Sequence, residues 1–164
     1  MLQLLLNLAG FYDYTLPSPD GSSLPLSRYK GKKVMIINIA SASRYSFQLD
    51  SLETLYEKYH DNLTIIAVPS NSFLHEPLDD AGIQQLIATH HISFPVTARS
   101  VVTGATRLPL YEWLAKKDLN SIVDYAVLGD FQKVLISPEG KIVGMFSGAT
   151  NPMDIYVQEA VAGH

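Results

Sequence analysis

Residues 34–40 read Val-Met-Ile-Ile-Asn-Ile-Ala, and this stretch decides the fold class. It is a continuous apolar run, rich in β-branched side chains, that lies between Lys32-Lys33 and a serine cluster. Such a run is typical of a strand that is buried on both faces of a parallel or mixed sheet. Residues 63–69, Leu-Thr-Ile-Ile-Ala-Val-Pro, have the same character. Between the two runs, residues 48–59 carry leucine and tyrosine at helical spacing, so the pattern predicts a strand–helix–strand crossover with parallel pairing.

The last third of the chain predicts antiparallel pairing. Residues 131–136 and 141–146 flank the turn sequence Ser-Pro-Glu-Gly, which is typical of a β-hairpin. Residues 153–162 read as a final helix, with Pro152 at an early position where proline is tolerated. Two central parallel strands, a late hairpin and helices on both faces describe an α/β sandwich with a mixed sheet.

Shorter segments complete this order. Residues 11–16 alternate around two tyrosines before the turn sequence 17–21, which predicts a first strand, and Ser27 is a candidate cap for a helical turn that ends near Gly31. The remaining short predictions are an opening strand or docked turn over 1–10, helices over 79–90 and 110–117, and an extended segment over 92–96.

Composition limits the function classes. The chain has 164 residues, a mass of 18.1 kDa and a formal net charge of -4. A chain of this size buries roughly two-thirds of its surface on folding, which predicts one domain over residues 1–164. The hydrophobic content of 47% and charged content of 17% exclude intrinsic disorder. Because basic residues are few, the chain is not expected to bind nucleic acid.

The sequence contains no cysteine. This absence excludes disulfides, iron–sulfur clusters, thiolate zinc sites and thiol catalysis. No stretch approaches the roughly 20 apolar residues that span a membrane, and residues 1–10 lack the basic start of a signal peptide. We therefore expect a soluble, cytoplasmic protein, or a periplasmic or secreted one if a leader has been trimmed. The sequence leaves the oligomeric state open.

Several short motifs follow one another in a characteristic order along nearly the whole chain. They are FYDYTL (11–16), YKGKKV (29–34), NIAS (38–41), LETLYEKY (52–59), PSNSF (69–73), PLYEWL (109–114), FQKVLI (131–136) and EGK (139–141). Together they resemble the glutathione peroxidases. The resemblance implies a thioredoxin-like three-layer sandwich with a mixed central sheet and an N-terminal hairpin. It also implies an ancestral activity in which glutathione or thioredoxin reduces hydroperoxides.

The resemblance also identifies the positions where the family carries its catalytic residues. The family's cysteine or selenocysteine corresponds to Ser43, and its supporting glutamine corresponds to Ser72. Its tryptophan–asparagine pair corresponds to Gly129 and Asp130. Of this group and its neighbours, Asn71 alone is retained.

These substitutions remove the chemistry that the family uses. A thiolate ionises near neutral pH and passes through a sulfenic acid that a second thiol can reduce, whereas a serine hydroxyl does neither. Asp130 would place an anion beside a nucleophile that must itself be negative. We therefore predict a degenerate member, without a cofactor, that acts as a binding or scaffold protein for a small molecule or a protein partner. The alternative is an active peroxidase of the oxidative-stress response, seen here as a Cys-to-Ser variant at position 43.

A second reading of the same residues is a hydrolase. Ser43, His75 and Asp130 are the residue types of a serine–histidine–aspartate triad, because the loop of His75 is expected to border the same face. No Gly-x-Ser-x-Gly motif surrounds Ser43, however. The plainer interpretation is that Ser43 is a solvated helix-capping hydroxyl.

Two further polar groups have structural explanations. His75, His90 and His91 suggest a metal, but adjacent histidines on a helix point in different directions, and we expect no metal site. The pair at 90–91 is also favourably placed at a helix C-terminus. Arg44, next to the Ser43 position, is a candidate to receive an anion or to pair with a surface carboxylate.

Overall fold

The computed structural model describes residues 8–163 and is built on a four-stranded sheet in the order β4-β3-β5-β6. Strands β3 (Lys33–Ile39) and β4 (Leu63–Pro69) pair in parallel along their whole length. Strand β5 (Lys133–Ile136) pairs antiparallel with β3 and with β6 (Ile142–Phe146). The predicted mixed sheet and late hairpin are confirmed. Most of the opening segment, for which a strand or docked turn was predicted, lies outside the described residues.

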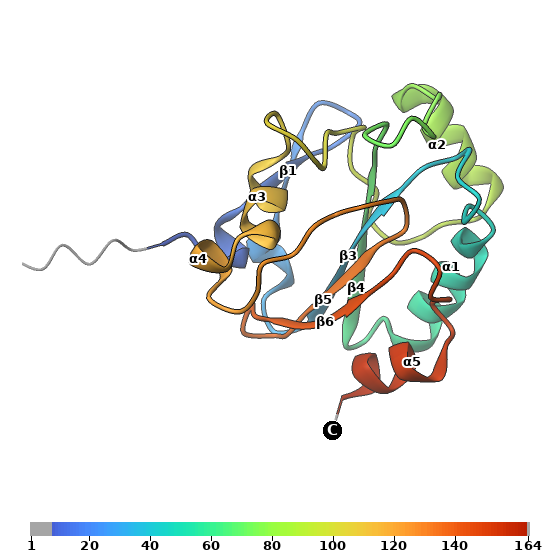
Figure 1. Ribbon diagram of the computed structural model, residues 1–164. Helices are drawn as coiled ribbons and strands as arrows, with labels where there is room; N and C mark the ends of the chain where they lie inside the picture. Colours follow the sequence, from blue (N-terminus) through green and yellow to red (C-terminus); the bar gives the residue numbers. More distant parts are fainter. Residues whose placement is uncertain (1–7, 164) are drawn as a thin grey trace, which may run out of the picture.

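Helices cover both faces of this sheet (Figure 1). Helices α1 (Gln48–Tyr59) and α5 (Ile155–Ala162) lie on one side, and α3 (Pro109–Ala115) and α4 (Lys117–Asn120) lie on the other. The alternation of β3 explains this arrangement, because successive side chains point to opposite faces. One core contains Met35, Ile37 and Ile39 with α1 leucines, and the other contains Val34 and Ile36 with α3 side chains. The three-layer sandwich is confirmed.

The connection after β4 also follows the sequence pattern. Helix α2 (Asp80–Thr89) begins after Asp79, whose carboxylate accepts a hydrogen bond from the Gly82 amide at 2.9 Å. The extended segment that follows forms a single parallel bridge between Val96 and Ala67. This bridge places the segment beside the outer edge of β4.

The N-terminal hairpin is present, but its first strand begins later than predicted. Residues Phe11–Asp13 form a 3-10 turn, η1, because the Asp13 carboxylate accepts a hydrogen bond from the Gly10 amide at 2.8 Å. Strand β1 (Thr15–Pro17) then pairs antiparallel with β2 (Ser23–Pro25). The next turn, η2 (Leu26–Tyr29), places Pro25 rather than Ser27 at the cap position, so the Ser27 cap was wrong.

Two helix boundaries also differ from the prediction. The helix predicted over 110–117 ends at Ala115, and α4 begins at Lys117 after extended backbone at Lys116. The final helix begins at Ile155, because the Asp154 carboxylate accepts a hydrogen bond from the Tyr156 amide and caps it. Pro152 therefore precedes this helix instead of lying in its first turn. Within residues 8–163, no helix is long and apolar enough to span a membrane.

Candidate functional site: a pocket beyond the ends of the central strands

A pocket of about 370 Å³ lies beyond the carboxyl ends of β3 and β4. Ser43 follows β3, Ser72 follows β4, and Gly129 and Asp130 precede β5. Because β3 and β4 are parallel and β5 is antiparallel to β3, the segments that follow β3 and β4 and the segment that precedes β5 meet at the same end of the strands. The structure therefore brings together the four residues that the family resemblance singled out. We call this cavity, with Ser43, Ser72, Gly129 and Asp130 in its wall, the Ser43 pocket.

Asn71 does not line the Ser43 pocket. It lines a neighbouring cavity of about 580 Å³ together with Ser72 and Arg99. The Asn71 side-chain oxygen accepts a hydrogen bond from the Glu76 amide at 3.0 Å. The retained asparagine thus holds the shape of the loop after β4.

Backbone contacts hold the loop before β5 in place. The Asn38 side-chain amide donates to the Gly129 carbonyl at 2.9 Å, and the Phe131 amide donates to the Asn38 carbonyl at 2.6 Å. Gly148 packs so closely here that a Cβ on it would lie 2.2 Å from the Asp130 carbonyl oxygen. Only glycine permits this approach, so the position of Asp130 is set by backbone packing.

Ser43 is 5% exposed and forms part of a turn before α1. Its hydroxyl accepts a hydrogen bond from the Tyr45 amide at 3.2 Å. Helix α1 begins at Gln48, with Phe47 at the cap position. The interpretation of Ser43 as a solvated helix cap was therefore wrong: its side chain is buried, and it stabilises a turn that precedes the helix.

Asp130 and His75 form the most polar contact of the pocket. The Asp130 carboxylate oxygen Oδ2 lies 2.6 Å from His75 Nδ1, with side-chain exposures of 4% and 54%. The second carboxylate oxygen, Oδ1, is buried and has no hydrogen-bond partner. This pairing assembles two of the three residues of the triad considered above. Among the described residues, no hydrogen bond joins Ser43 to His75, so the serine is not activated in this arrangement.

Ser72 holds backbone together instead of facing a reactive group. Its hydroxyl accepts hydrogen bonds from the Ser70 hydroxyl at 2.9 Å and from the Val102 amide at 3.0 Å. These contacts connect the loop after β4 to residue 102. The side chain is thus committed to loop packing.

The structure separates the three histidines. His75 contacts Asp130, whereas His90 Nδ1 lies 2.8 Å from an oxygen of Asp50 on α1. Across residues 8–163, no three histidine, aspartate or glutamate side chains are close enough together to hold a metal ion. Arg44 lies in the wall of the Ser43 pocket and is exposed.

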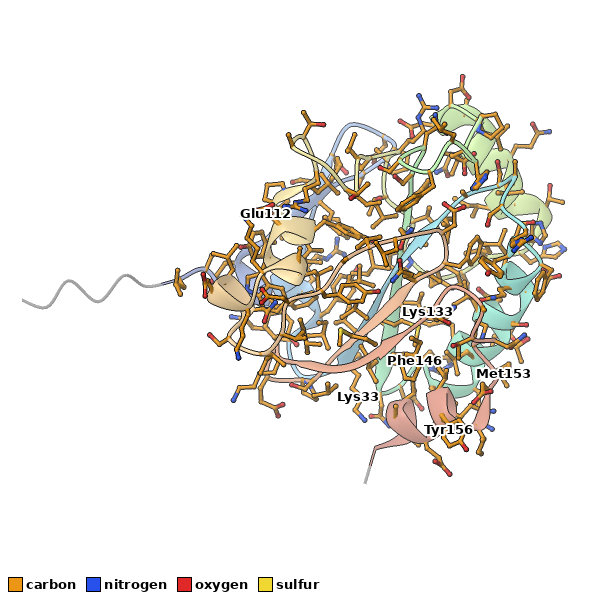
Figure 2. All side chains as sticks on the ribbon, in the orientation of Figure 1. Lys33, Glu112, Lys133, Phe146, Met153 and Tyr156 are labelled. Atoms are coloured by element: carbon orange, nitrogen blue, oxygen red, sulfur yellow. The ribbon has the colours of Figure 1, made fainter. Side chains whose placement is uncertain are left out.

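Two features of the site had no sequence signal that identified them. Leu74 and Leu128 border the pocket with exposures of 84% and 80%, and Leu74 adopts a positive φ of 65°. Lys133, labelled in Figure 2, is fully buried at the start of β5, and its ammonium donates to the Phe131 carbonyl at 2.8 Å. Burial lowers the pKa of Lys133 to about 7. The exposed leucines depend on a loop conformation that the sequence does not reveal. The burial of Lys133 depends on tertiary packing, which brings the carbonyls of Phe131 and Ser147 to its ammonium.

A family model described as glutathione peroxidase matches residues 11–115. The chain belongs to the glutathione peroxidase family. The probable glutathione peroxidase 2 of Arabidopsis thaliana is 35% identical over 146 residues, which covers 87% of this chain and 86% of that relative. The glutathione peroxidase homolog BsaA of Bacillus subtilis is 32% identical and covers 88% of this chain and 92% of that relative.

Solved structures agree with this assignment. The crystal structure of Trgpx in its apo form has a TM-score of 0.71 at 28% identity and covers 94% of this glutathione peroxidase family member and 97% of that chain. A thioredoxin family protein from Chlorobium tepidum has a TM-score of 0.67 at 14% identity and covers 95% of both chains, a likeness of fold alone. The predicted thioredoxin-like fold is confirmed.

Proposed function

We propose that this member of the glutathione peroxidase family has lost thiol peroxidase activity and uses the Ser43 pocket to bind a small molecule or a protein partner. One observation carries the proposal. Ser43 occupies the position that the family resemblance gives to the sulfur or selenium nucleophile, and the chain has no cysteine that could replace it. On this proposal the chain does not convert the family's substrates, which are hydroperoxides and glutathione or thioredoxin, even where it binds them.

The chemistry of the missing atom supports the loss of activity. In thiol peroxidase chemistry, a thiolate attacks one peroxide oxygen, the O–O bond breaks, an alcohol or water leaves, and sulfur is oxidised to a sulfenic acid that thiols reduce. A serine oxygen that attacked in the same way would break the substrate's O–O bond but form a new O–O bond to itself, so no peroxide bond would be reduced overall. A general base beside Ser43 would not restore the reaction, because a serine oxygen cannot be oxidised and recycled as the sulfur nucleophile is.

The surroundings of Ser43 support the same conclusion. The buried carboxylate of Asp130, which contacts His75, lies at the position for which the resemblance implies asparagine, a neutral hydrogen-bond donor. A carboxylate disfavours a neighbouring thiolate by charge repulsion. Gly129 provides no side chain at all. A thiol restored at position 43 would therefore lack the groups that lower its pKa and orient the peroxide.

The exposed rim of the pocket supports a binding role. Leu74 and Leu128 expose large apolar surfaces beside a cavity that also holds Arg44 and His75. Neighbouring apolar side chains that stay in water at a cavity mouth are typical of binding surfaces. The positive φ of Leu74 costs energy that folding does not recover through burial. A bound ligand or partner would cover these side chains.

The activity test uses the purified chain. We expect no consumption of hydrogen peroxide or cumene hydroperoxide above a buffer control, with either reduced glutathione or a thioredoxin system as the reductant. Enzymatic turnover by the unaltered protein would overturn the proposal. A cysteine codon for residue 43 in the encoding gene would instead support the alternative of an active peroxidase.

Restoring cysteine at position 43 tests whether the missing sulfur atom alone prevents activity or whether the residues around it also do. Ser43→Cys is expected to recover little activity, whereas Ser46→Cys, in the same turn but outside the pocket wall, is the matched thiol control. Adding Ser72→Gln and Asp130→Asn to Ser43→Cys should increase the rate by about tenfold or more, because the donors return and the anion is removed. Full activity of Ser43→Cys alone would show that the surroundings still function.

A further inference from the structure

A further cavity, of about 290 Å³, lies between helix α3 and the segment that leads to β5. We call it the α3 pocket. Helix α3 lies on the far side of the sheet from α5 (Figure 1). Its apolar wall includes Val127 and Leu128, and the polar residues in its lining include Arg107, Tyr111, Lys116 and Tyr125. Leu128 borders both this pocket and the Ser43 pocket, so the two cavities are neighbours.

Tyr111, on α3, brings a buried hydroxyl to this wall. Its side chain is 2% exposed, and the hydroxyl has no hydrogen-bond partner. Burial raises the pKa of Tyr111, and the neighbouring Tyr125 phenol adds to the shift, so Tyr111 is a neutral donor at any physiological pH. A buried donor without an acceptor costs about 1–3 kcal/mol. A ligand acceptor entering the cavity would relieve this cost.

Tyr125 is oriented as a second donor. The Gln132 side-chain amide donates to the Tyr125 hydroxyl oxygen at 2.7 Å. The other end of Gln132 accepts hydrogen bonds from the Leu128 and Gly129 amides, so this side chain cannot rotate to become an acceptor. Within the described chain, the Tyr125 proton has no acceptor. The phenol therefore has a free proton to give to a ligand.

Two cations lie at the same cavity and share one carboxylate. Arg107 Nε and Lys116 Nζ both contact Glu112, which lies on α3 as labelled in Figure 2. Both cations lower the pKa of Glu112, so this carboxylate stays charged. The three side chains carry a net charge of plus one, and the terminal guanidinium nitrogens of Arg107 make no other hydrogen bond among the described residues. The local field favours an anion.

We propose that the α3 pocket binds a small organic carboxylate with an apolar body. The two phenols and the two cations offer donors to a carboxylate, whereas the apolar wall suits a ring or a short chain. The volume lies at the lower end of the usual range for ligand cavities, which limits the ligand to a few carbon atoms beyond the acid group. The assignment is independent of the function proposed for the Ser43 pocket.

Benzoate is the probe, and benzamide is its uncharged counterpart of the same shape. We expect benzoate to shift the backbone amide signals of residues in α3 and around Tyr125 in an ¹H–¹⁵N NMR titration. Benzamide should bind about tenfold more weakly, because it lacks the charge that the cations recognise. Equal binding of the two compounds, or no benzoate binding at millimolar concentration, would overturn the proposal.

Variants then locate the site. Tyr125→Phe and Tyr111→Phe should each weaken benzoate binding about tenfold. The thermal unfolding temperature should stay near that of the parent protein for Tyr125→Phe and should rise for Tyr111→Phe, because that variant removes a buried hydroxyl without a partner. Tyr156→Phe, on α5 at the other side of the molecule (Figure 2), should bind benzoate like the parent. If both tyrosine variants in the pocket bind benzoate normally, the ligand lies elsewhere and the assignment is wrong.

The charge is tested by two adjacent lysines. Lys116→Gln should weaken benzoate binding several-fold, and added salt should reduce the difference. Lys117→Gln removes the same charge from the next residue, which does not line the cavity, and should change binding little. Equal effects of the two substitutions would mean that the ligand responds only to net charge, which contradicts a built site.

Discussion

The strand centres and the loops at their ends differ in what their residues do in this molecule. Along β3 and β4, fully buried apolar residues keep the pattern that the fold needs. Just beyond their carboxyl ends, Ser43, Ser72, Gly129 and Asp130 line one pocket, at the positions for which the family resemblance predicts the catalytic residues. The comparison shows that the packing of the strands and the chemistry of a site place different demands on the residues. Packing depends on apolar volume and periodicity, whereas redox catalysis depends on one kind of atom held among specific donors.

The largest effect is expected when the strand centres are changed. Ile36 is 1% exposed and lies in β3 opposite Ile66 of β4 and Val134 of β5. Ile36→Ala should lower the free energy of unfolding by about 2–5 kcal/mol, because it removes buried methyl groups and leaves a cavity. The measurement is chemical denaturation followed by circular dichroism.

Ser43→Ala provides the contrast in the same assay. Its hydroxyl makes one hydrogen bond to a turn amide, so the loss should be about 1 kcal/mol or less. A larger loss for Ser43→Ala than for Ile36→Ala would remove the distinction in stability between the packed strand centres and the loops that line the Ser43 pocket.

Lys133 lies where the two regions meet and predicts a dependence of stability on pH. Its folded-state pKa of about 7 is depressed below the ordinary lysine value by burial. Between these two values the unfolded chain binds more protons, so this lysine makes the free energy of unfolding rise from about pH 7 to about pH 10, by about 1.4 kcal/mol for each pH unit in that range. Below about pH 7 both states are protonated, and this contribution is flat.

Lys133→Met is the control for this dependence. The difference in unfolding free energy between Lys133→Met and the parent should favour the variant most near pH 6 and shrink as the pH rises. A difference that is constant between pH 6 and pH 10 would show that the ammonium stays protonated in the folded chain.

The smallest expected effect concerns the rim of the Ser43 pocket. Leu74 is 84% exposed at a positive φ, a conformation that asparagine tolerates better than leucine. Leu74→Asn should raise the thermal unfolding temperature slightly, equivalent to about 0.5–1 kcal/mol. A lower unfolding temperature would mean that this leucine stabilises the fold, which would contradict the binding role proposed for the rim of the pocket.

The long buried elements were predictable because their signals are repetitive. Helix α1 and strand β4 extend over the ranges that the sequence pattern predicted. Their periodic apolar residues record which face is buried, and a single substitution does not erase such a record. The meeting of Ser43, His75 and Asp130 at one pocket also followed from strand order, because connections at one edge of a sheet converge.

The short elements were less predictable because single side chains decide them. The carboxylates of Asp13 and Asp154 set where η1 and α5 begin, and an aspartate in sequence does not reveal which amide it will accept from. The hydroxyl of Ser43 became a turn contact instead of a helix cap for the same reason.

The amino-acid sequence by itself determined the sheet, the family and the absence of sulfur at the expected nucleophile position, because periodicity, motif order and composition are properties of the chain read in one dimension. The tertiary structure alone decided the Asp130–His75 contact geometry, the buried Lys133 ammonium and the donors gathered around the α3 pocket. Each of these depends on distances between segments far apart in the chain, and it is those distances that set desolvation, pairing and charge.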